Sequence, residues 1–396
     1  MTKTYQDYLD MLGFKESSSI PGGVQNYAIE NRFGFIGKYQ FGEAALFDLG
    51  YYGIDNSDSN LFKNDWIGNW SGKDGINNKQ DYFNSGAVQE SVIRDWHEML
   101  WKRINFLDLD KYAGQILNGS QITISGMLAA SHLIGAGSQS SDTAGLKGYL
   151  FSGAVFSPED GNGTTADQFM TVFEGFQTPF FVDHSIAETI EGGIGNDILT
   201  GFGGNDTLIG EEGTDIAIYH SHSSAYDLLK QSDEIWVIQQ LNDGQDGRDI
   251  LAGIERIKFL DTSLALDLNN DAGITAKILG AVFGPESVSN QTYTGIGLNL
   301  LDNGISYEAL MQFAINSALG GNATNHAQVV DLLYENVVGV APSAVEKDFY
   351  VELLDSGAHT ISSIGIMAAE TALNQENVDL VGLSQTGLAY LPDLAV

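Results

Sequence analysis

The sequence contains no cysteine among its 396 residues. Disulfide bonds, thiolate metal sites and thiol redox chemistry are therefore excluded. Basic residues are also scarce, with 18 Lys and Arg against 52 Asp and Glu, and the formal net charge is −34. Nucleic-acid binding needs clustered basic side chains, and an anionic membrane surface repels a polyanion, so we expect neither as a partner.

Long apolar runs are missing as well. No stretch of about 18 apolar residues occurs, so no membrane insertion is expected. The first eight residues, MTKTYQDY, lack the basic start and apolar core of a secretory signal. Taken alone, these absences predict a soluble cytoplasmic protein. Hydrophobic residues still make up 43% of the chain, so disorder throughout is excluded.

The acidic charge is unevenly distributed. Residues 1–180 carry a net charge of −9 and residues 181–396 carry −25. Pro179 stands just before an unusually glycine-rich tract, which favours a domain boundary near this position. The length itself predicts two or three domains.

Three consecutive nonapeptides begin at Gly192: GGIGNDILT, GFGGNDTLI and GEEGTDIAI. Each has glycine at its first and fourth positions and aspartate at its sixth, which gives Asp197, Asp206 and Asp215. Glycine permits tight turns, aspartate supplies a hard oxygen ligand, and the closing triplets are typical of short strands. Stacked turns form a parallel β-roll in which residues 18 apart lie above one another, so Asp197 and Asp215 can face one ion. We predict that this ion is Ca²⁺.

An ordinary Gly-Asn-Asp turn is the structural alternative, but three copies in register favour calcium binding. The repeat is imperfect at Phe202, at Glu211 and Glu212 and at Ala217, and Asp206 would pair with Glu188, a weaker match. We therefore expect one or two sites. The predicted metal-site residues are Asp197, Asp206, Asp215, Gly193, Gly195, Gly204 and Gly213.

The nonapeptides resemble those of the repeats-in-toxin (RTX) family of secreted calcium-binding proteins. Residues 243–268 look like the strand-rich cap that commonly closes such rolls. The resemblance implies export from a bacterium by a type I secretion exporter with an uncleaved C-terminal signal. The last residues, Asp393 to Val396, resemble the ending of some family members. The expected location thus changes to secreted, extracellular or cell-surface.

Calcium is expected to control folding of the roll. In a calcium-poor cytosol the carboxylates of residues 181–271 would repel one another and keep the roll unfolded, which suits export. Outside the cell, calcium would neutralise them and couple binding to folding.

Residues 271–396 contain helical patterns, such as Val329, Leu332, Leu333 and Val337 on one face. They are similar to tails found behind RTX repeats, which predicts a helical export and folding module without catalysis. His220 and His222 follow the roll, but two histidines without a partnered cluster are more typical of surface residues than of a metal site.

Residues 1–180 are predicted to be mainly helical. Apolar residues at four-residue spacing from Val88 to Ile104 indicate a long helix, and shorter helices are expected over residues 5–15 and around Ile124 to His132. Residues 51–84 are predicted to be loop, with Trp66 and Trp70 as anchors or sugar-stacking surfaces.

Three segments of this region invite a chemical interpretation: Glu16-Ser17 at the end of the first helix, GKYQF at 37–41, and AASHLIGAG at 129–137. A glutamate at the end of an apolar-faced helix can be partly desolvated, which raises its pKa and suits a general acid. A lone glutamate there is more commonly a solvated surface residue. A catalytic role for Glu16 is therefore supported only by the three segments taken together.

The combination resembles the lysozyme-like superfamily, in particular lytic transglycosylases and phage-type muramidases. The resemblance implies that Glu16 protonates the glycosidic oxygen. It also implies that Tyr39 and Gln40 line the cleft, with His132 on the opposite wall and Asn31 as a further substrate-binding residue. Ser18 and the pair Ser131-His132 depart from the family pattern, which has glycine and Tyr-Asn there.

A hydrolase with two carboxylates would need a second Asp or Glu near Glu16. Asp65, Asp74 and Asp81 are the candidates, and we favour Asp74 because it lies in the tight turn WSGKDG. If no carboxylate approaches, the substrate's N-acetyl group can stabilise the developing cation while Glu16 acts alternately as acid and base, which is the transglycosylase route.

The sequence therefore predicts a multidomain α+β protein. Its predicted domains are a mainly α lysozyme-like catalytic domain (1–180), a short parallel β-roll with its β cap (181–270) and a helical C-terminal module (271–396). The leading hypothesis is a secreted, calcium-dependent enzyme that cleaves β-1,4 bonds of peptidoglycan or a related N-acetylglucosamine polymer, with a cell-wall glycan as its partner. The alternative is a non-catalytic surface or adhesion protein with a glycan-binding module. A protease lacks support, because no His-Glu-X-X-His or Gly-X-Ser-X-Gly motif occurs.

Overall fold

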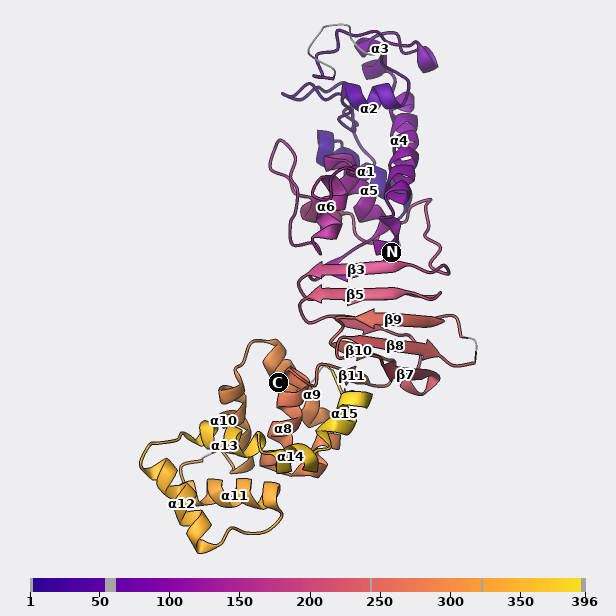
Figure 1. Cartoon of the computed structure of the whole chain (residues 1–396). Coiled ribbons are helices and arrows are strands. Elements are labelled where there is room, and N and C mark those ends of the chain that lie inside the picture. Colours follow the sequence, from indigo (N-terminus) through magenta and orange to yellow (C-terminus); the bar gives the residue numbers. More distant parts are fainter. Residues whose placement is uncertain (1–2, 54–61, 243, 322, 393–396) are drawn as a thin grey trace. The chain divides into compact units, whose positions relative to one another are not determined.

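The computed structural model describes residues 3–53, 62–242, 244–321 and 323–392. The chain divides into two compact units, Met1–Asp183 and His184–Val396, which we call the N-terminal and C-terminal units. The ending Asp393 to Val396 and the first residue of the predicted cap, Asp243, lie outside the described residues. The predicted order of a helical region, a β region and a second helical region is confirmed (Figure 1).

The N-terminal unit is mainly helical. Its elements are α1 (Tyr5–Ser17), α2 (Glu43–Asp48), η1 (Lys73–Gly75), α3 (Lys79–Asn84), α4 (Gly86–Phe106), η2 (Asp110–Tyr112), β1 (Ile116–Leu117), β2 (Ser120–Gln121), α5 (Ile124–Ile134), α6 (Gly145–Phe151) and α7 (Ala166–Val172). The three predicted helices correspond to α1, α4 and α5. The predicted loop over 51–84 instead contains η1 and α3 in its second half.

Periodic apolar residues build the core of this unit. Tyr8, Leu9 and Leu12 of α1 are fully buried, and Trp96 and Leu100 of α4 are buried as well. Thr4 begins α1 with a capping box, because its side chain and that of Asp7 each accept a hydrogen bond from the other residue's backbone.

The C-terminal unit begins with two sheets and continues into helices. Its strands are β3 (Thr189–Ile194), β4 (Ile198–Leu199), β5 (Thr207–Glu212), β6 (Ile216–Ile218), β7 (Tyr226–Lys230), β8 (Ile235–Gln240), β9 (Arg248–Ala252), β10 (Arg256–Lys258), β11 (Ser263–Ala265) and β12 (Leu388–Tyr390), with η3 (Ser223–Ala225) before β7. One sheet has the order β3-β5-β9-β8-β7 (Figure 1). In the other sheet β4, β6, β10, β11 and β12 follow one another.

Parallel pairing in both sheets shows the predicted 18-residue stacking. Thr189 pairs with Thr207 in β3 and β5, and Ile198 pairs with Ile216 in β4 and β6. The inward residues Ile190, Leu199 and Leu208 are fully buried. Residues 244–268 are rich in strands, as predicted, since they contain β9, β10 and β11. β9 and β10 also continue the two sheets in parallel with β5 and β6, while β9 pairs antiparallel with β8 and β10 with β11.

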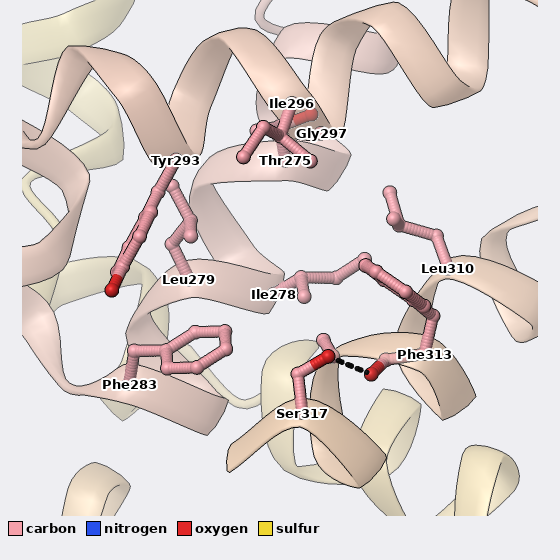
Figure 2. A pocket seen from close by; sticks show the side chains of 11 residues that line it. Thr275, Ile278, Leu279, Phe283, Tyr293, Ile296, Gly297, Leu310, Phe313 and Ser317 are labelled. Atoms are coloured by element: carbon pink, nitrogen blue, oxygen red, sulfur yellow. Dashed lines mark hydrogen bonds between the residues drawn. The ribbon is translucent and has the colours of Figure 1, made fainter. Parts of the chain in front are cut away.

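The helices of this unit are α8 (Asp271–Phe283), η4 (Pro285–Ser289), α9 (Gln291–Asp302), α10 (Tyr307–Ala318), α11 (His326–Val338), α12 (Ala344–Asp355), α13 (Ile361–Ala369), α14 (Ala372–Asn377) and α15 (Leu380–Thr386). The predicted apolar face of α11 is confirmed, because Val329, Leu333 and Val337 are buried and Leu332 is partly buried against the same core. Side chains of α8, α9 and α10 surround an apolar hollow of about 290 Å³, shown in Figure 2.

Candidate functional site

Glu16 lies in the last turn of α1, at a point where the chain reverses sharply. Ser18 adopts a left-handed conformation with φ of 58°, and its backbone N–H caps the helix through the carbonyl oxygens of Gly13 and Phe14. Glycine is favoured at such a position, so Ser18 adopts a conformation that few residues with a side chain adopt. The hydroxyl of Ser17 donates to the Gly13 carbonyl oxygen at 2.9 Å and fixes the turn beside Glu16.

A cleft opens beside Glu16. It consists of two adjoining hollows of about 540 and 680 Å³ that share Glu16, Asn31, Leu133, Asp160 and Asn162. The first hollow also reaches the predicted residues Gln40 and His132. The structure therefore brings Glu16, Asn31, Gln40 and His132 together, although they span more than a hundred positions of the sequence.

Burial controls the protonation of the two titratable groups that face each other here. The Glu16 side chain is 17% exposed, and burial, with a smaller contribution from Asp160, raises its pKa to about 8. The side chain of His132 is 6% exposed, and burial lowers its pKa to about 4. Near neutral pH, Glu16 therefore holds its proton while His132 is neutral.

His132 has a defined tautomer. Its Nε2 atom lies 3.1 Å from the backbone carbonyl oxygen of Tyr39, and this oxygen can only accept. Nε2 therefore carries the hydrogen, and its distance to Glu16 Oε1 is 4.0 Å. Neutral His132 therefore links α5 to the backbone of Tyr39 through this hydrogen bond.

The segment at 37–41 is anchored from behind. Lys38 Nζ donates to Glu90 Oε1 at 2.7 Å, and the Tyr39 hydroxyl donates to Glu90 Oε2 at 2.7 Å. Tyr39 is fully buried, so the prediction that its side chain lines the cleft was wrong. Gln40 does line the cleft, with its Nε2 donating to the Gly37 carbonyl oxygen at 2.7 Å. The anchoring residue Glu90 carried no recognisable motif in the sequence.

The favoured second carboxylate lies elsewhere. Asp74 accepts a hydrogen bond of 2.5 Å from the Tyr51 hydroxyl, and neither it nor Asp65 or Asp81 is among the residues that line the two hollows. Asp81 instead accepts from the backbone N–H of Asn77. Besides Glu16, the carboxylates that line the two hollows are Glu159 in the first, Asp167 in the second and Asp160 in both, and sequence reasoning missed all three.

Asp160 is held by its own turn. Its Oδ1 accepts from the backbone N–H groups of Asn162 and Thr164, each at 2.8 Å. The sequence DGNGTT signals a turn but gives no indication that the turn lies against Glu16. The exposed rings of Phe33 and Phe35 also line the cleft. Trp66 and Trp70 stack on each other with 5.5 Å between ring centroids and are not among the residues that line the two hollows.

The candidate calcium sites lie in the turns of the roll. Gly193, Gly195, Gly204 and Gly213 all have positive φ, from 94° to 147°. A Cβ on Gly213 would lie 1.9 Å from the Gly195 carbonyl oxygen, and one on Gly204 would lie 2.7 Å from that of Ile186. Glycine is required because successive turns stack backbone against backbone.

The aspartates of the turns are almost completely buried. Asp197 and Asp215 are 0% exposed and Asp206 is 1% exposed. Asp197 N–H donates to Asp215 Oδ1 at 2.8 Å, and Glu188 N–H donates to Asp206 Oδ1 at 2.8 Å. The predicted pairing of residues 18 apart, including Glu188 with Asp206, is confirmed.

The residues of the turns fit a divalent cation. The Oδ2 atoms of Asp206 and Asp215 are buried without a hydrogen-bond partner among the described residues. Burial raises the pKa of Asp206 to about 6 and that of Asp215 to about 7, as expected for carboxylates without a neutralising charge. No three His, Cys, Asp or Glu side chains converge within the described ranges, so calcium would need backbone carbonyl oxygens beside a carboxylate pair.

The two histidines after the roll are exposed, as predicted. His222 Nδ1 lies 3.6 Å from Asp261 Oδ2, and the His220 ring stacks at 6.4 Å on Phe202.

Comparison with known families identifies residues 185–217 as RTX calcium-binding nonapeptide repeats. The repeat implies calcium binding, in a structural role, and points to a secreted bacterial protein exported by type I secretion. Comparisons with curated proteins and with solved structures give no match. Among the described helices, none combines the length and the apolar character needed to cross a bilayer.

Proposed function

We propose that the N-terminal unit is a glycan-cleaving enzyme with Glu16 as its general acid and base. The observation that carries the proposal is the buried Glu16 on the wall of a cleft, with its pKa raised by burial to about 8. A carboxylic acid that keeps its proton near neutral pH can donate it to a glycosidic oxygen as the bond breaks.

The lining of the cleft supports a sugar substrate. Amide side chains can pair with hydroxyl and N-acetyl groups, and exposed aromatic rings can pack on the apolar faces of sugars. Both kinds are present beside Glu16, namely Asn31, Gln40, Asn64, Asn162, Phe33 and Phe35. Together with the resemblance to lytic transglycosylases, this favours β-1,4 bonds of peptidoglycan or a related N-acetylglucosamine polymer.

Glu16 would act twice in the reaction. Its proton moves to the leaving oxygen as the bond to the anomeric carbon breaks, and positive charge develops on the sugar. The Glu16 carboxylate then takes a proton from an attacking water, which gives a reducing end, or from a hydroxyl of the same sugar, which gives an anhydro end. Asp160 can stabilise the charge in the first route, and the N-acetyl group of the substrate can do so in the second.

The test compares clearing of cell-wall suspensions by the wild type and by Glu16→Gln, with calcium present. Glu174→Gln is the matched control, because Glu174 is exposed and lies outside the cleft lining. We expect loss of clearing only in Glu16→Gln. Equal clearing by all three proteins would refute the catalytic assignment, and binding to glycan without new chain ends would favour the non-catalytic adhesion role.

We propose further that the chain leaves the cell by type I secretion with the roll unfolded, and that external calcium then folds the C-terminal unit. The support is the RTX repeat at 185–217 and the buried carboxylates in its turns. Bound calcium would supply charge neutralisation to Asp197, Asp206 and Asp215 and take no part in bond cleavage.

A further inference from the structure

The roll extends beyond the residues that carry the nonapeptide repeat. β9 lies parallel to β5, and Thr207 pairs with Ile250, 43 residues later. β10 lies parallel to β6, and Ile216 pairs with Arg256, 40 residues later. The usual 18-residue step is lengthened because η3 and the hairpin β7–β8 are inserted between β6 and β9. The chain therefore resumes the same roll after an interruption (Figure 1).

The same carboxylate contact occurs on both sides of the interruption. Within the repeat, the N–H of Glu188 donates to Asp206 Oδ1 at 2.8 Å. Across the interruption, the N–H of Asp206 donates to Asp249 Oδ1, also at 2.8 Å. Glu188, Asp206 and Asp249 thus form one continuous ladder, and its last member lies outside residues 185–217.

The loop that carries Asp249 has the composition of a repeat turn. Residues 244–249 read GQDGRD, with glycine at the first and fourth positions and aspartate at the sixth. Gly247 has φ of 64°, and a Cβ there would lie 1.7 Å from the Gly204 carbonyl oxygen. The Gly204 N–H donates to the Gln245 carbonyl oxygen at 3.1 Å. Residues 244–249 therefore stack backbone against backbone on residues 201–206, as turns within the repeat do.

A buried and unsatisfied oxygen lies in this stack. Asp206 is 1% exposed, and its Oδ2 has no hydrogen-bond partner in the described part of the chain. Asp249 is 2% exposed, and its Oδ2 accepts a hydrogen bond of 2.8 Å from the Tyr219 hydroxyl. The two buried carboxylates stand in adjacent turns, which also contain the backbone carbonyl oxygens of Gly204 and Gln245. Carboxylate and carbonyl oxygens are the ligand types that calcium prefers.

We propose that residues 201–206 and 244–249 form a further calcium site, with Asp206 and Asp249 as its carboxylate ligands and backbone carbonyl oxygens completing the coordination. The ion would join the chain before the hairpin insertion to the chain after it. The proposal is independent of the glycan-cleaving function.

A second ladder of carboxylates in the roll runs through Asp215 to Glu255, but the turn before Glu255 lacks the composition of a repeat turn. The N–H of Asp215 donates to Glu255 Oε2 at 2.8 Å, so the ladder continues there too. The preceding residues read ILAGIE, however, with no glycine at the first position and no aspartate at the sixth. We therefore propose no further calcium site at Glu255.

The test counts calcium ions bound to the full chain by equilibrium dialysis with metal analysis. Asp249→Asn keeps the size and one acceptor oxygen of the side chain while removing its charge. The matched control is Asp246→Asn, which makes the same charge change in the same loop, where Asp246 bonds to Tyr226 and takes no part in the ladder. We expect Asp249→Asn to bind one ion fewer than the wild type and Asp246→Asn to bind the same number. Equal counts in all three proteins would overturn the proposal.

A second measurement covers the case in which Asp249→Asn does not fold. Terbium replaces calcium in oxygen sites and emits when a nearby tyrosine is excited. Because Tyr219 contacts Asp249 and Tyr226 lies 5.2 Å from Tyr219 between ring centroids, these rings would sensitise an ion in this site. We expect Tyr219→Phe to lower tyrosine-sensitised emission with an unchanged ion count. Unchanged emission from Tyr219→Phe would contradict a site at Asp249.

Discussion

The burial of Glu16 couples its ionisation to the stability of the N-terminal unit. The ordinary pKa of 4.5 applies in the unfolded chain, whereas burial raises the pKa to about 8 in the folded one. Below pH 4.5 both states hold the proton. Between these values only the unfolded state releases it, so the free energy of unfolding falls as pH rises and levels off above about pH 8.

Replacing Glu16 by glutamine removes this ionisation from the folded and the unfolded state. We expect Glu16→Gln to unfold like the wild type near pH 4 and to be more stable by a few kcal/mol near pH 9, on the order of the cost of ionising a buried carboxyl. Urea unfolding of the N-terminal unit at both pH values, with saturating calcium, measures the difference. An equal stability of the two proteins near pH 9 would show that Glu16 is not desolvated.

The same ionisation sets the pH dependence of the proposed activity. The general acid must be protonated at the start of the reaction, so kcat/KM should fall as pH rises through about 8. Rates on soluble glycan fragments across this range provide the measurement. A fall of kcat/KM that is already complete just above pH 4.5, the ordinary pKa of glutamate, would contradict the assignment of Glu16 as the acid.

Glu90 has a structural role that no sequence motif indicated. It accepts hydrogen bonds from Lys38, Tyr39 and Tyr27, and the Lys38 side chain is 2% exposed. We expect Glu90→Ala to lower the free energy of unfolding by about 3–5 kcal/mol, because a buried ammonium loses its close partner. Glu98→Ala on the exposed side of the same helix is the control and should change stability by less than about 0.5 kcal/mol.

The candidate cleft was only partly predictable for a physical reason. Glu16 and Gln40 lie in short motifs whose residue types and order identify them. Asp160 and Asn162 reach Glu16 only when their turn folds against α1 and α5, and no local pattern encodes that contact. Tyr39 was misplaced because its motif fixes the backbone position but not whether the side chain points to the cleft or to Glu90.

At the scale of elements, the roll was predictable up to its interruption. A fixed period of 18 residues gave the pairing of β3 with β5 and of β4 with β6. The pairing of β5 with β9 depends on a 43-residue step, which no periodic pattern shows. The segment predicted as a cap thus also continues the roll, because β9 and β10 extend its two sheets beyond the inserted hairpin β7–β8.

Backbone stacking in the roll gives a prediction for glycine. Gly213→Ala would place a Cβ 1.9 Å from the Gly195 carbonyl oxygen at a φ of 147°, so the turns must separate. Gly253→Ala is the control, since Gly253 has φ of 59° but no contact closer than 3.5 Å. We expect a cost of about 1 kcal/mol for the control, from backbone strain alone. Denaturant unfolding in calcium should show a clearly larger loss for Gly213→Ala, and equal losses would argue against close stacking.

At the scale of the whole molecule, the excess negative charge belongs to the C-terminal unit. Residues 181–396 carry −25 of the total charge of −34. Within this unit the roll and the helices share contacts. Arg256 of β10 is buried and pairs with Asp267 and with Asp302 at the end of α9, and β11 pairs with β12. Loss of calcium from the roll should therefore destabilise the helices α8 to α15 as well.

Calcium removal should consequently unfold one unit and spare the other. Each occupied site contributes about 2.7 kcal/mol when free calcium exceeds Kd about 100-fold, so stripping two sites removes much of the stability of a typical domain. Calorimetry of the full chain should show two transitions, of which a chelator shifts only one. Trp236 in β8 is 2% exposed and is the one tryptophan of the C-terminal unit, so the fluorescence that Trp236→Phe removes should follow the shifted transition. A chelator that shifted both transitions equally, or neither, would contradict calcium as the factor that folds the C-terminal unit.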